Sequence, residues 1–217
     1  MRVTVFDYGA GNLHSLAKAL AGPGIEVRIE SDSVLALDTD ALVLPGVGAF
    51  GAAAERLAPG RKAMRAALDA GLPCIGICLG MQLLFESSEE GEGLGLGLIT
   101  GRVERIRARR VPHIGWNTIE EANDPLFARS PLGLAYFANG FVCRPVDAFA
   151  ITAWSRHETD RFAAAVRRGR TVGVQFHPEK SSRAGVRFLQ AFVAEAASMS
   201  LGAKPAPNAA ASPERAR

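Results

Sequence analysis

The sequence has few cysteines and no long apolar run, and each shortage excludes a class of protein. Its three cysteines, Cys74, Cys78 and Cys143, are too few and odd in number for a disulfide framework. Cys74 and Cys78 would lie about 13 Å apart on an extended strand, too far to bridge. No apolar run approaches the roughly 18 residues of a membrane span, and Asp7 comes too early for a signal peptide. We therefore expect a cytoplasmic protein with reduced thiols and no membrane contact.

Neither sign of charge dominates the chain. The 25 Lys and Arg residues stand against 22 Asp and Glu residues, a net charge of +3. Residues 202–217 contribute +2 and residues 102–110, with five Arg and one Glu, contribute +4. Because the excess of positive charge is confined to these two short stretches, it does not predict nucleic-acid binding. We interpret 102–110 as an exposed strand edge kept soluble by charge, with a phosphate-facing or partner-facing patch as the alternative.

The chain is long enough for one domain with its own core. Of its 217 residues, 48% are hydrophobic, which is close to the globular average. From residue 202 onward it has three prolines and no large apolar side chain. This composition predicts one domain over 1–199 and a disordered tail over 200–217.

Short strand-like runs alternate with helical patterns in the first half of the chain. Strands are predicted at 2–6, 25–29, 41–44 and 73–77, and helices at 13–21, 50–70 (interrupted near Pro59) and 79–86. Shorter strands follow at 96–107, 114–119, 134–142, 149–153, 162–166 and 171–176, before a helix over 183–197. The pattern predicts an α/β fold: a three-layer sandwich with a mostly parallel, mixed central sheet, flanked by helices, with antiparallel strands added at one edge.

The sequence Gly-Ile-Cys-Leu-Gly at 76–80 is the sharpest chemical signal. A strand that enters Gly-x-Cys-x-Gly and leaves as a helix is typical of a nucleophile elbow, with sulfur in place of oxygen. The helix N-terminus after Cys78 favours a thiolate, and the amide of Leu79 would face a developing oxyanion. The alternative is a buried core cysteine between two space-saving glycines, which is how we interpret Cys74 and Cys143.

A cysteine nucleophile needs a base, and His177 is the candidate. It follows the strand-like run 171–176, and Glu179 lies two residues further on, where it could orient the imidazole. His14, His113 and His157 are interpreted as surface or structural residues. The histidines and cysteines lack the spacing of zinc ligands, so no metal site is predicted.

Two glycine-rich turns follow predicted strands. The turn Pro-Gly-Val-Gly-Ala-Phe at 45–50 could offer backbone N–H groups to an anion, or be an ordinary connection. The turn at 9–14 has His14 where the third glycine of a dinucleotide fingerprint would stand, so no nucleotide site is expected there.

Taken together, these motifs resemble the class I (triad-type) glutamine amidotransferases. Gly-x-Cys-x-Gly-Met-Gln at 76–82 followed by Gln-Phe-His-Pro-Glu at 175–179 is similar to their signature. Four stretches resemble the glutaminase subunits of imidazole glycerol phosphate synthase, an enzyme of histidine biosynthesis; these are residues 7–13, 45–50, 112–117 and 177–181. The likeness runs from residue 1 to about 197.

The resemblance implies a role for each matching residue. Cys78 would attack the side-chain amide of L-glutamine and form a glutamyl thioester, with His177 moving protons and Glu179 orienting it. The backbone of Val47 and Leu79 would form the oxyanion hole. The glutamine-binding residues would be Gly48, Gln82, Gly140 and Phe141.

The resemblance also implies a partner, a cyclase subunit of (β/α)₈-barrel type. Ammonia would pass into it to yield imidazole glycerol phosphate and an aminoimidazole carboxamide ribotide, without a cofactor. Positions that match the partner-facing ones are Asn12, Trp116, Asn117, Tyr136 and Lys180. The run Ala-Asn-Gly-Phe at 138–141 departs from the family pattern, which has a histidine and hydroxyl groups there, and this bears on glutamine affinity or on coupling to the partner.

Other functions remain open at this level. They are a glutaminase subunit that serves another acceptor, a free-standing cysteine hydrolase and a non-catalytic regulatory subunit. The stretches at 7–13 and 112–117 disfavour another acceptor. The partner-facing positions disfavour a free-standing hydrolase, and the intact Cys78, His177 and Glu179 disfavour a regulatory subunit.

Overall fold

The computed structural model describes residues 1–9 and 13–202, with side chains described up to Ser198. Asn12 and most of the predicted tail, residues 203–217, lie outside the described residues. No helix in the described part of the chain is long and apolar enough to cross a membrane.

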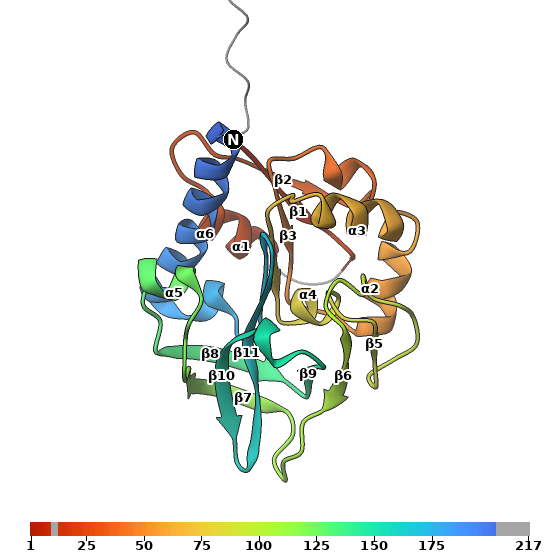
Figure 1. The fold of residues 1–217 in the computed structure, drawn as a ribbon, viewed down its shortest axis with the longest axis vertical. Helices are drawn as coiled ribbons and strands as arrows, with labels where there is room; N and C mark the ends of the chain where they lie inside the picture. The colour runs from red at the N-terminus through yellow and green to blue at the C-terminus, as the bar shows by residue number, and fades with distance from the viewer. Residues whose placement is uncertain (10–12, 203–217) are drawn as a thin grey trace, which may run out of the picture.

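A seven-stranded mixed sheet forms the middle layer (Figure 1). Its strands are β1 (Arg2–Phe6), β2 (Glu26–Glu30), β3 (Ala41–Leu44), β4 (Cys74–Ile77), β10 (Ile151–His157), β11 (Asp160–Arg168) and β12 (Thr171–Val174). They lie in the order β10-β11-β12-β4-β3-β1-β2. The pairs from β12 to β2 are parallel, whereas β10, β11 and β12 pair antiparallel at one edge. The predicted sheet is confirmed.

Helices cover both faces of this sheet. On one face lie α1 (Leu13–Leu20), α5 (Pro125–Arg129) and α6 (Ser182–Gly202), and on the other α2 (Phe50–Leu57), α3 (Arg61–Asp69) and α4 (Leu79–Gln82). The inner strands β1, β3, β4 and β12 are buried on both faces and read as near-continuous apolar runs, and two hydrophobic clusters form. One contains Leu16 and Phe188, and the other Leu57 and Met64. The three-layer sandwich is therefore confirmed.

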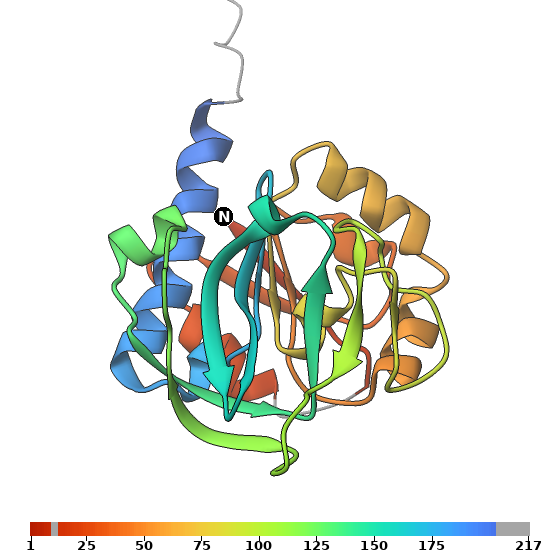
Figure 2. The ribbon, with the colours of Figure 1, turned by 60° about the horizontal axis from the view of Figure 1, so that its bottom comes forward.

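Two small sheets extend the sandwich. The strands β5 (Ser87–Ser88), β6 (Gly101–Arg105) and β9 (Phe141–Pro145) form one, in the order β5-β6-β9. The antiparallel pair of β7 (His113–Thr118) and β8 (Leu134–Asn139) forms the other and runs along the bottom of the molecule in Figure 2. Single-turn 3₁₀ helices span Leu35–Leu37, Ala148–Ala150 and Pro178–Lys180.

Several predicted elements differ from the observed ones. The run predicted as one strand at 134–142 is β8 and β9, separated at Gly140, because the chain turns away there toward β6. The helix expected over 79–86 is the single turn of α4. The strand expected over 96–107 is limited to β6, and α5, which begins at the N-cap Asp124, was not predicted.

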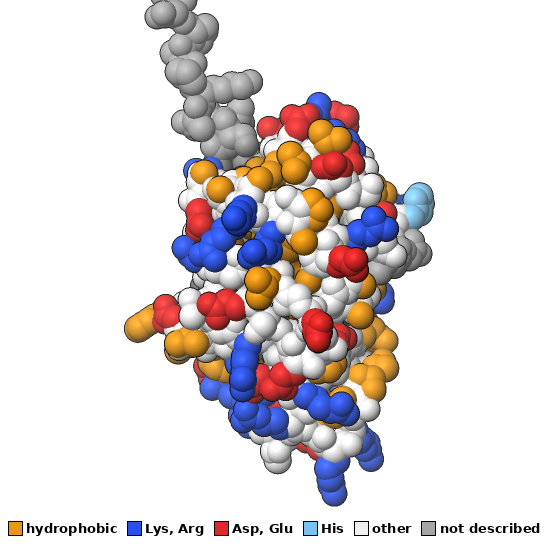
Figure 3. Space-filling view, turned by 90° about the vertical axis from the view of Figure 1, so that its right-hand side faces the viewer, with side chains coloured by type: hydrophobic (Ala, Val, Ile, Leu, Met, Phe, Trp, Pro, Cys, Tyr) orange, Lys and Arg blue, Asp and Glu red, His pale blue; other side chains and the backbone are white. Residues whose placement is uncertain are grey.

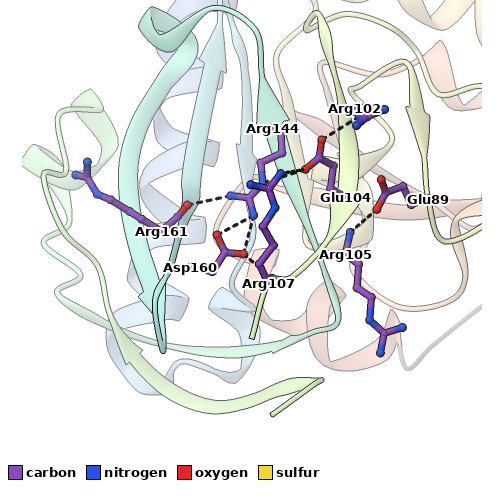
Figure 4. Close-up of polar contacts among 8 residues, drawn as sticks. All are labelled: Glu89, Arg102, Glu104, Arg105, Arg107, Arg144, Asp160 and Arg161. Atoms are coloured by element: carbon purple, nitrogen blue, oxygen red, sulfur yellow. Dashed lines mark hydrogen bonds and ion pairs between the residues drawn. The ribbon is translucent and has the colours of Figure 1, made fainter. Parts of the chain in front are cut away.

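The arginine-rich stretch 102–110 is not the sheet edge that we expected, because β6 is paired on both sides. Two of its arginines, Arg102 and Arg107, form ion pairs with Glu104 (Figure 4). Glu104 accepts from Arg102 at 2.9 Å and from Arg107 at 2.7 Å. Arg144 of β9 binds both carboxylate oxygens of the buried Asp160, at 2.8 and 2.6 Å. The Arg144–Asp160 pair fastens the β6–β9 ladder to β11 of the central sheet. Positive and negative side chains are also interspersed over the face drawn in Figure 3.

Candidate functional site

Cys78 lies at the sharp turn between β4 and α4. Its backbone has φ +47° and ψ −104°, a strained conformation that an L-residue rarely adopts. The turn is possible because glycines flank it: a side chain on Gly76 would meet the backbone of Gly80, and one on Gly80 would meet Leu44. This geometry is that of the predicted nucleophile elbow.

His177 lies beside Cys78 and is oriented by Glu179. The imidazole Nδ1 is 2.8 Å from Oε1 of Glu179, and both side chains are largely buried. Burial alone would lower the pKa of His177, but hydrogen bonds to Cys78 and Glu179 and their charges outweigh it and raise that pKa to about 9. The arrangement keeps a proton on the imidazole next to the sulfur.

Backbone contacts fix the position of His177. It directly follows the buried Phe176 at the carboxyl end of β12, and its N–H donates to the carbonyl of Tyr136 in β8 at 2.8 Å. The hydroxyl of Ser181 donates to the His177 carbonyl at 2.7 Å and accepts from the N–H of Tyr136 at 2.9 Å. Strand β8 therefore anchors the histidine from outside the central sheet.

A cavity of about 190 Å³ opens over Cys78 and His177. The predicted residues that line it are Val47, Gly48, Cys78, Leu79, Gln82, Gly140, Phe141, His177 and Lys180. Gly46, Glu90, Ala138 and Asn139 complete its lining. The fold thus brings the predicted nucleophile, base, oxyanion and glutamine-binding residues into one cavity, with Glu179 directly behind the base.

The loop after β3 forms one wall of this cavity. Gly48 has a φ of +122°, which a glycine adopts without strain. Gly46 packs so closely on the catalytic centre that an added methyl group would lie 2.9 Å from Cε1 of His177. The loop therefore places Val47 in the same cavity as Cys78 and Leu79.

The 138–141 run forms another wall. The side chain of Gln82 donates to the carbonyl of Phe141 at 3.4 Å, and that of Asn139 donates to the same carbonyl at 3.0 Å. The carbonyl of Gly140 accepts from the N–H of Ile106 at 2.9 Å. In this chain Asn139 therefore holds the loop through the Phe141 backbone.

Two residues at the site were not predicted. The carboxylate of Glu90 enters the cavity and accepts from the N–H of Phe50 at 2.9 Å. The side chain of Gln175 contacts the sulfur of Cys78 at 3.4 Å. Gln175 stands inside the recognised motif, two residues before His177, and this position was the available signal. The polar run around Glu90 gave no signal in the sequence that this residue belongs to the site.

The predicted partner-facing residues divide into two groups. Trp116 is half exposed and packs edge-on against Tyr136 in the β7–β8 pair. Lys180 is exposed at the cavity. The side chain of Asn117 is turned inward, where it donates to the carbonyl of Arg156 at 2.8 Å.

In the described part of the chain, neither the remaining cysteines nor a group of metal-binding side chains forms a second site. Cys74 and Cys143 are fully buried and unbridged, and burial raises the pKa of both thiols. Within residues 1–9 and 13–202, no three His, Cys, Asp or Glu side chains are grouped so that they could hold a metal ion.

Comparison with known proteins agrees with this geometry. The model of the glutamine amidotransferase class-I family matches residues 4–196. "Imidazole glycerol phosphate synthase subunit HisH" of Synechococcus sp. (strain JA-3-3Ab) is 42% identical over 201 residues, which cover 89% of this chain and 93% of that protein. The protein of the same name from Symbiobacterium thermophilum is 45% identical over 197 residues, covering 87% and 91%.

Solved structures share the fold. The structure of PurLQS from Thermotoga maritima has a TM-score of 0.67 at 21% identity, covering 89% of this chain and 98% of that one. A structure described as a glutamine amidotransferase has a TM-score of 0.67 at 22% identity, covering 88% and 98%. The chain belongs to the class-I glutamine amidotransferase family, among the HisH subunits of imidazole glycerol phosphate synthase.

Proposed function

We propose that this chain hydrolyses L-glutamine to glutamate and ammonia through a thioester on Cys78. The observation that carries the proposal is the strained turn of Cys78 beside the His177–Glu179 pair, in one cavity with Val47 and Leu79. A nucleophile, a base and an orienting carboxylate in hydrogen-bonded sequence form the arrangement that acyl transfer requires.

The first half of the reaction forms the thioester. The thiolate of Cys78 attacks the side-chain carbonyl carbon of glutamine, and the N–H groups of Val47 and Leu79 stabilise the oxyanion. The protonated His177 gives its proton to the amide nitrogen, the C–N bond breaks and ammonia leaves. Glu179 stabilises the imidazolium before this transfer.

The second half restores the enzyme. His177, now neutral, takes a proton from water, whose oxygen attacks the thioester carbonyl. The oxyanion forms again, the C–S bond breaks, and glutamate leaves while the sulfur regains its negative charge. The same base acts in both halves, so no cofactor is needed.

The cavity offers contacts for the rest of the substrate. The carboxylate of Glu90 matches the α-ammonium group of glutamine. Gly48, Gln82, Gly140 and Phe141 line the walls that would surround the chain of the substrate. Phe141 takes part through its carbonyl, which Asn139 and Gln82 hold in place.

We further infer that the ammonia passes to a cyclase subunit of (β/α)₈-barrel type, which uses it to form imidazole glycerol phosphate. The relatives' names, which describe a synthase subunit, support this. The β7–β8 pair supports it too, because its outer face exposes Ile114, Trp116 and Leu134 as an apolar strip, and the end of β8 lines the cavity. Lys180 lines the cavity and Tyr136 packs against Trp116 of this strip, which supports their predicted place at the interface.

A single comparison tests both parts of the proposal. Glutamate release is measured for wild type and Cys78→Ala, with and without a barrel cyclase and its ribotide substrate, and cyclase activity is measured with glutamine or with ammonia as the nitrogen source. We expect Cys78→Ala to lose glutamine-dependent cyclase activity and to keep ammonia-dependent activity. Equal glutamine-dependent activity of the two proteins would exclude the catalytic role, and no response to the cyclase would exclude the partner.

A further inference from the structure

The side-chain amide of Gln175 lies against the nucleophile, outside the cavity. Its Nε2 is 3.4 Å from Sγ of Cys78, which is hydrogen-bonding distance to sulfur. Gln175 is completely buried and does not line the cavity. Both His177 and this amide are thus hydrogen-bonded to the sulfur, and the buried Tyr8 and Cys143 side chains also interact with it electrostatically.

The backbone holds the amide in this place. Strands β12 and β4 pair in parallel, with Val174 opposite Ile77, so that Gln175 and Cys78 occupy the next position on each strand. The N–H of Cys78 donates to the carbonyl of Val174 at 2.6 Å. The N–H of Gln175 donates to the carbonyl of Ala164 in β11 at 2.9 Å. The two side chains therefore meet because of the sheet register.

The hydrogen bonding of this amide is one-sided. Its Nε2 points at the sulfur, whereas its Oε1 is buried with no hydrogen-bond partner in the described residues. Leaving an amide oxygen unpaired in a core is costly, so a residue kept there needs a reason beyond packing. A thiolate accepts hydrogen bonds and donates none, and Nε2 is the end of the amide that can bind it.

We propose that Gln175 is a further catalytic residue of this site, whose amide N–H stabilises the thiolate of Cys78. The inference rests on the proposed function and extends it to a group outside the triad. His177 must give its proton to the departing ammonia, and while it does so Gln175 can remain bound to sulfur. The bond is strongest when the sulfur is negative, so it favours both the attacking thiolate and the thiolate that leaves when the thioester is hydrolysed.

The test measures the rate at which iodoacetamide alkylates Cys78 as a function of pH, read on the Cys78 peptide by mass spectrometry. It compares wild type, Gln175→Leu and Gln175→Glu. The leucine variant keeps most of the volume and removes the unpaired oxygen, so it is expected to fold. Gln190→Leu, an exposed position on α6, is the matched control, and Cys78→Ala gives the background.

We expect the pH at half-maximal alkylation to rise by about one unit in Gln175→Leu, because a hydrogen bond to a charged group is lost. The carboxylate of Gln175→Glu should raise this pH further, because it repels the thiolate. The kcat measured with the cyclase should fall in both variants, whereas Gln190→Leu should match wild type. A midpoint in Gln175→Leu equal to that of wild type, with the fold intact by thermal unfolding, would overturn the role of Gln175. A wild-type protein that releases no glutamate would instead contradict the proposed function, and the alkylation midpoints would still decide the role of the amide.

Discussion

Substituting Gly46 by alanine should slow catalysis while the chain still folds. Gly46 does not need a positive φ, so alanine can adopt its backbone conformation. The added methyl group, however, would lie 2.9 Å from Cε1 of His177 and 3.0 Å from both the carbonyl oxygen and a side-chain carbon of Ile77. Ordinary contacts begin at 3.4 Å, so the site must yield by about 0.5 Å.

The direction of this movement determines its effect. The Ile77 carbonyl belongs to β4, which is paired on both sides, so the imidazole of His177 or the loop that carries Val47 must shift instead. A misplacement of 1 Å at a reacting centre costs about 100-fold in rate, so 0.5 Å predicts a loss of about tenfold in kcat. The tenfold loss corresponds to a rise of about 1.4 kcal/mol in the activation free energy. Overpacking should also lower the free energy of unfolding by about 1–2 kcal/mol.

Steady-state glutaminase kinetics with the cyclase present, together with urea unfolding, measure both quantities. Gly133→Ala is the matched control, because an added methyl group there meets nothing within 4 Å. It should leave kcat unchanged. Wild-type kcat in Gly46→Ala, with the fold intact, would refute the assignment of this close contact to the catalytic geometry.

Three further substitutions give separate tests. Glu179→Gln removes the carboxylate that holds His177 at 2.8 Å, and kcat should fall about 100-fold with little change in KM; a loss below threefold would contradict the orienting role. His113 is buried, and burial and the neighbouring His157 lower its pKa to about 4, so the unfolded chain binds the extra proton and stability declines as the pH falls from about 6.5 to 4. Urea titrations at several pH values measure this loss of unfolding free energy, and His113→Gln should remove up to about 3 kcal/mol of it. If the unfolding free energy of the variant fell with pH as steeply as that of wild type, the role of His113 would be refuted. Arg144→Met leaves Asp160 buried without its cation and should lower the unfolding free energy by about 3 kcal/mol, with partial recovery when Asp160→Asn is added; no loss would show the pair to be neutral.

The sequence predicted the part of the molecule that depends on local patterns. The alternation of apolar strands and helices indicated the parallel sheet, and the glycines at 76 and 80 indicated the turn at Cys78, because few backbones other than a tight elbow require both. His177 and Glu179 could be predicted for the same reason, because Glu179, which binds the imidazole, is only two positions from His177 in the sequence.

The features that were missed depend on contacts between distant segments. Glu90 reaches the cavity through a bond to Phe50, 40 residues earlier, and no local pattern encodes that distance. The stretch 102–110 resembles an exposed edge because most of its contacts are distant in the sequence: β6 pairs with β9, with Gly101 opposite Pro145, and the N–H of Arg107 donates to Asp160. Gly140 fits the pattern of one continuous strand, although its carbonyl binds Ile106 and the chain turns there.

The catalytic elements join strands that are distant in the sequence but adjacent in space. Strand β4 pairs with β3 on one side and with β12, about 100 residues later, on the other. During refolding, long-range parallel pairing is slow because a large loop must close first. Glutaminase activity should therefore return only when β12 docks on β4, later than the helical signal. A partly folded chain would hold a reactive cysteine without its base, so the enzyme releases no ammonia before its sheet is complete.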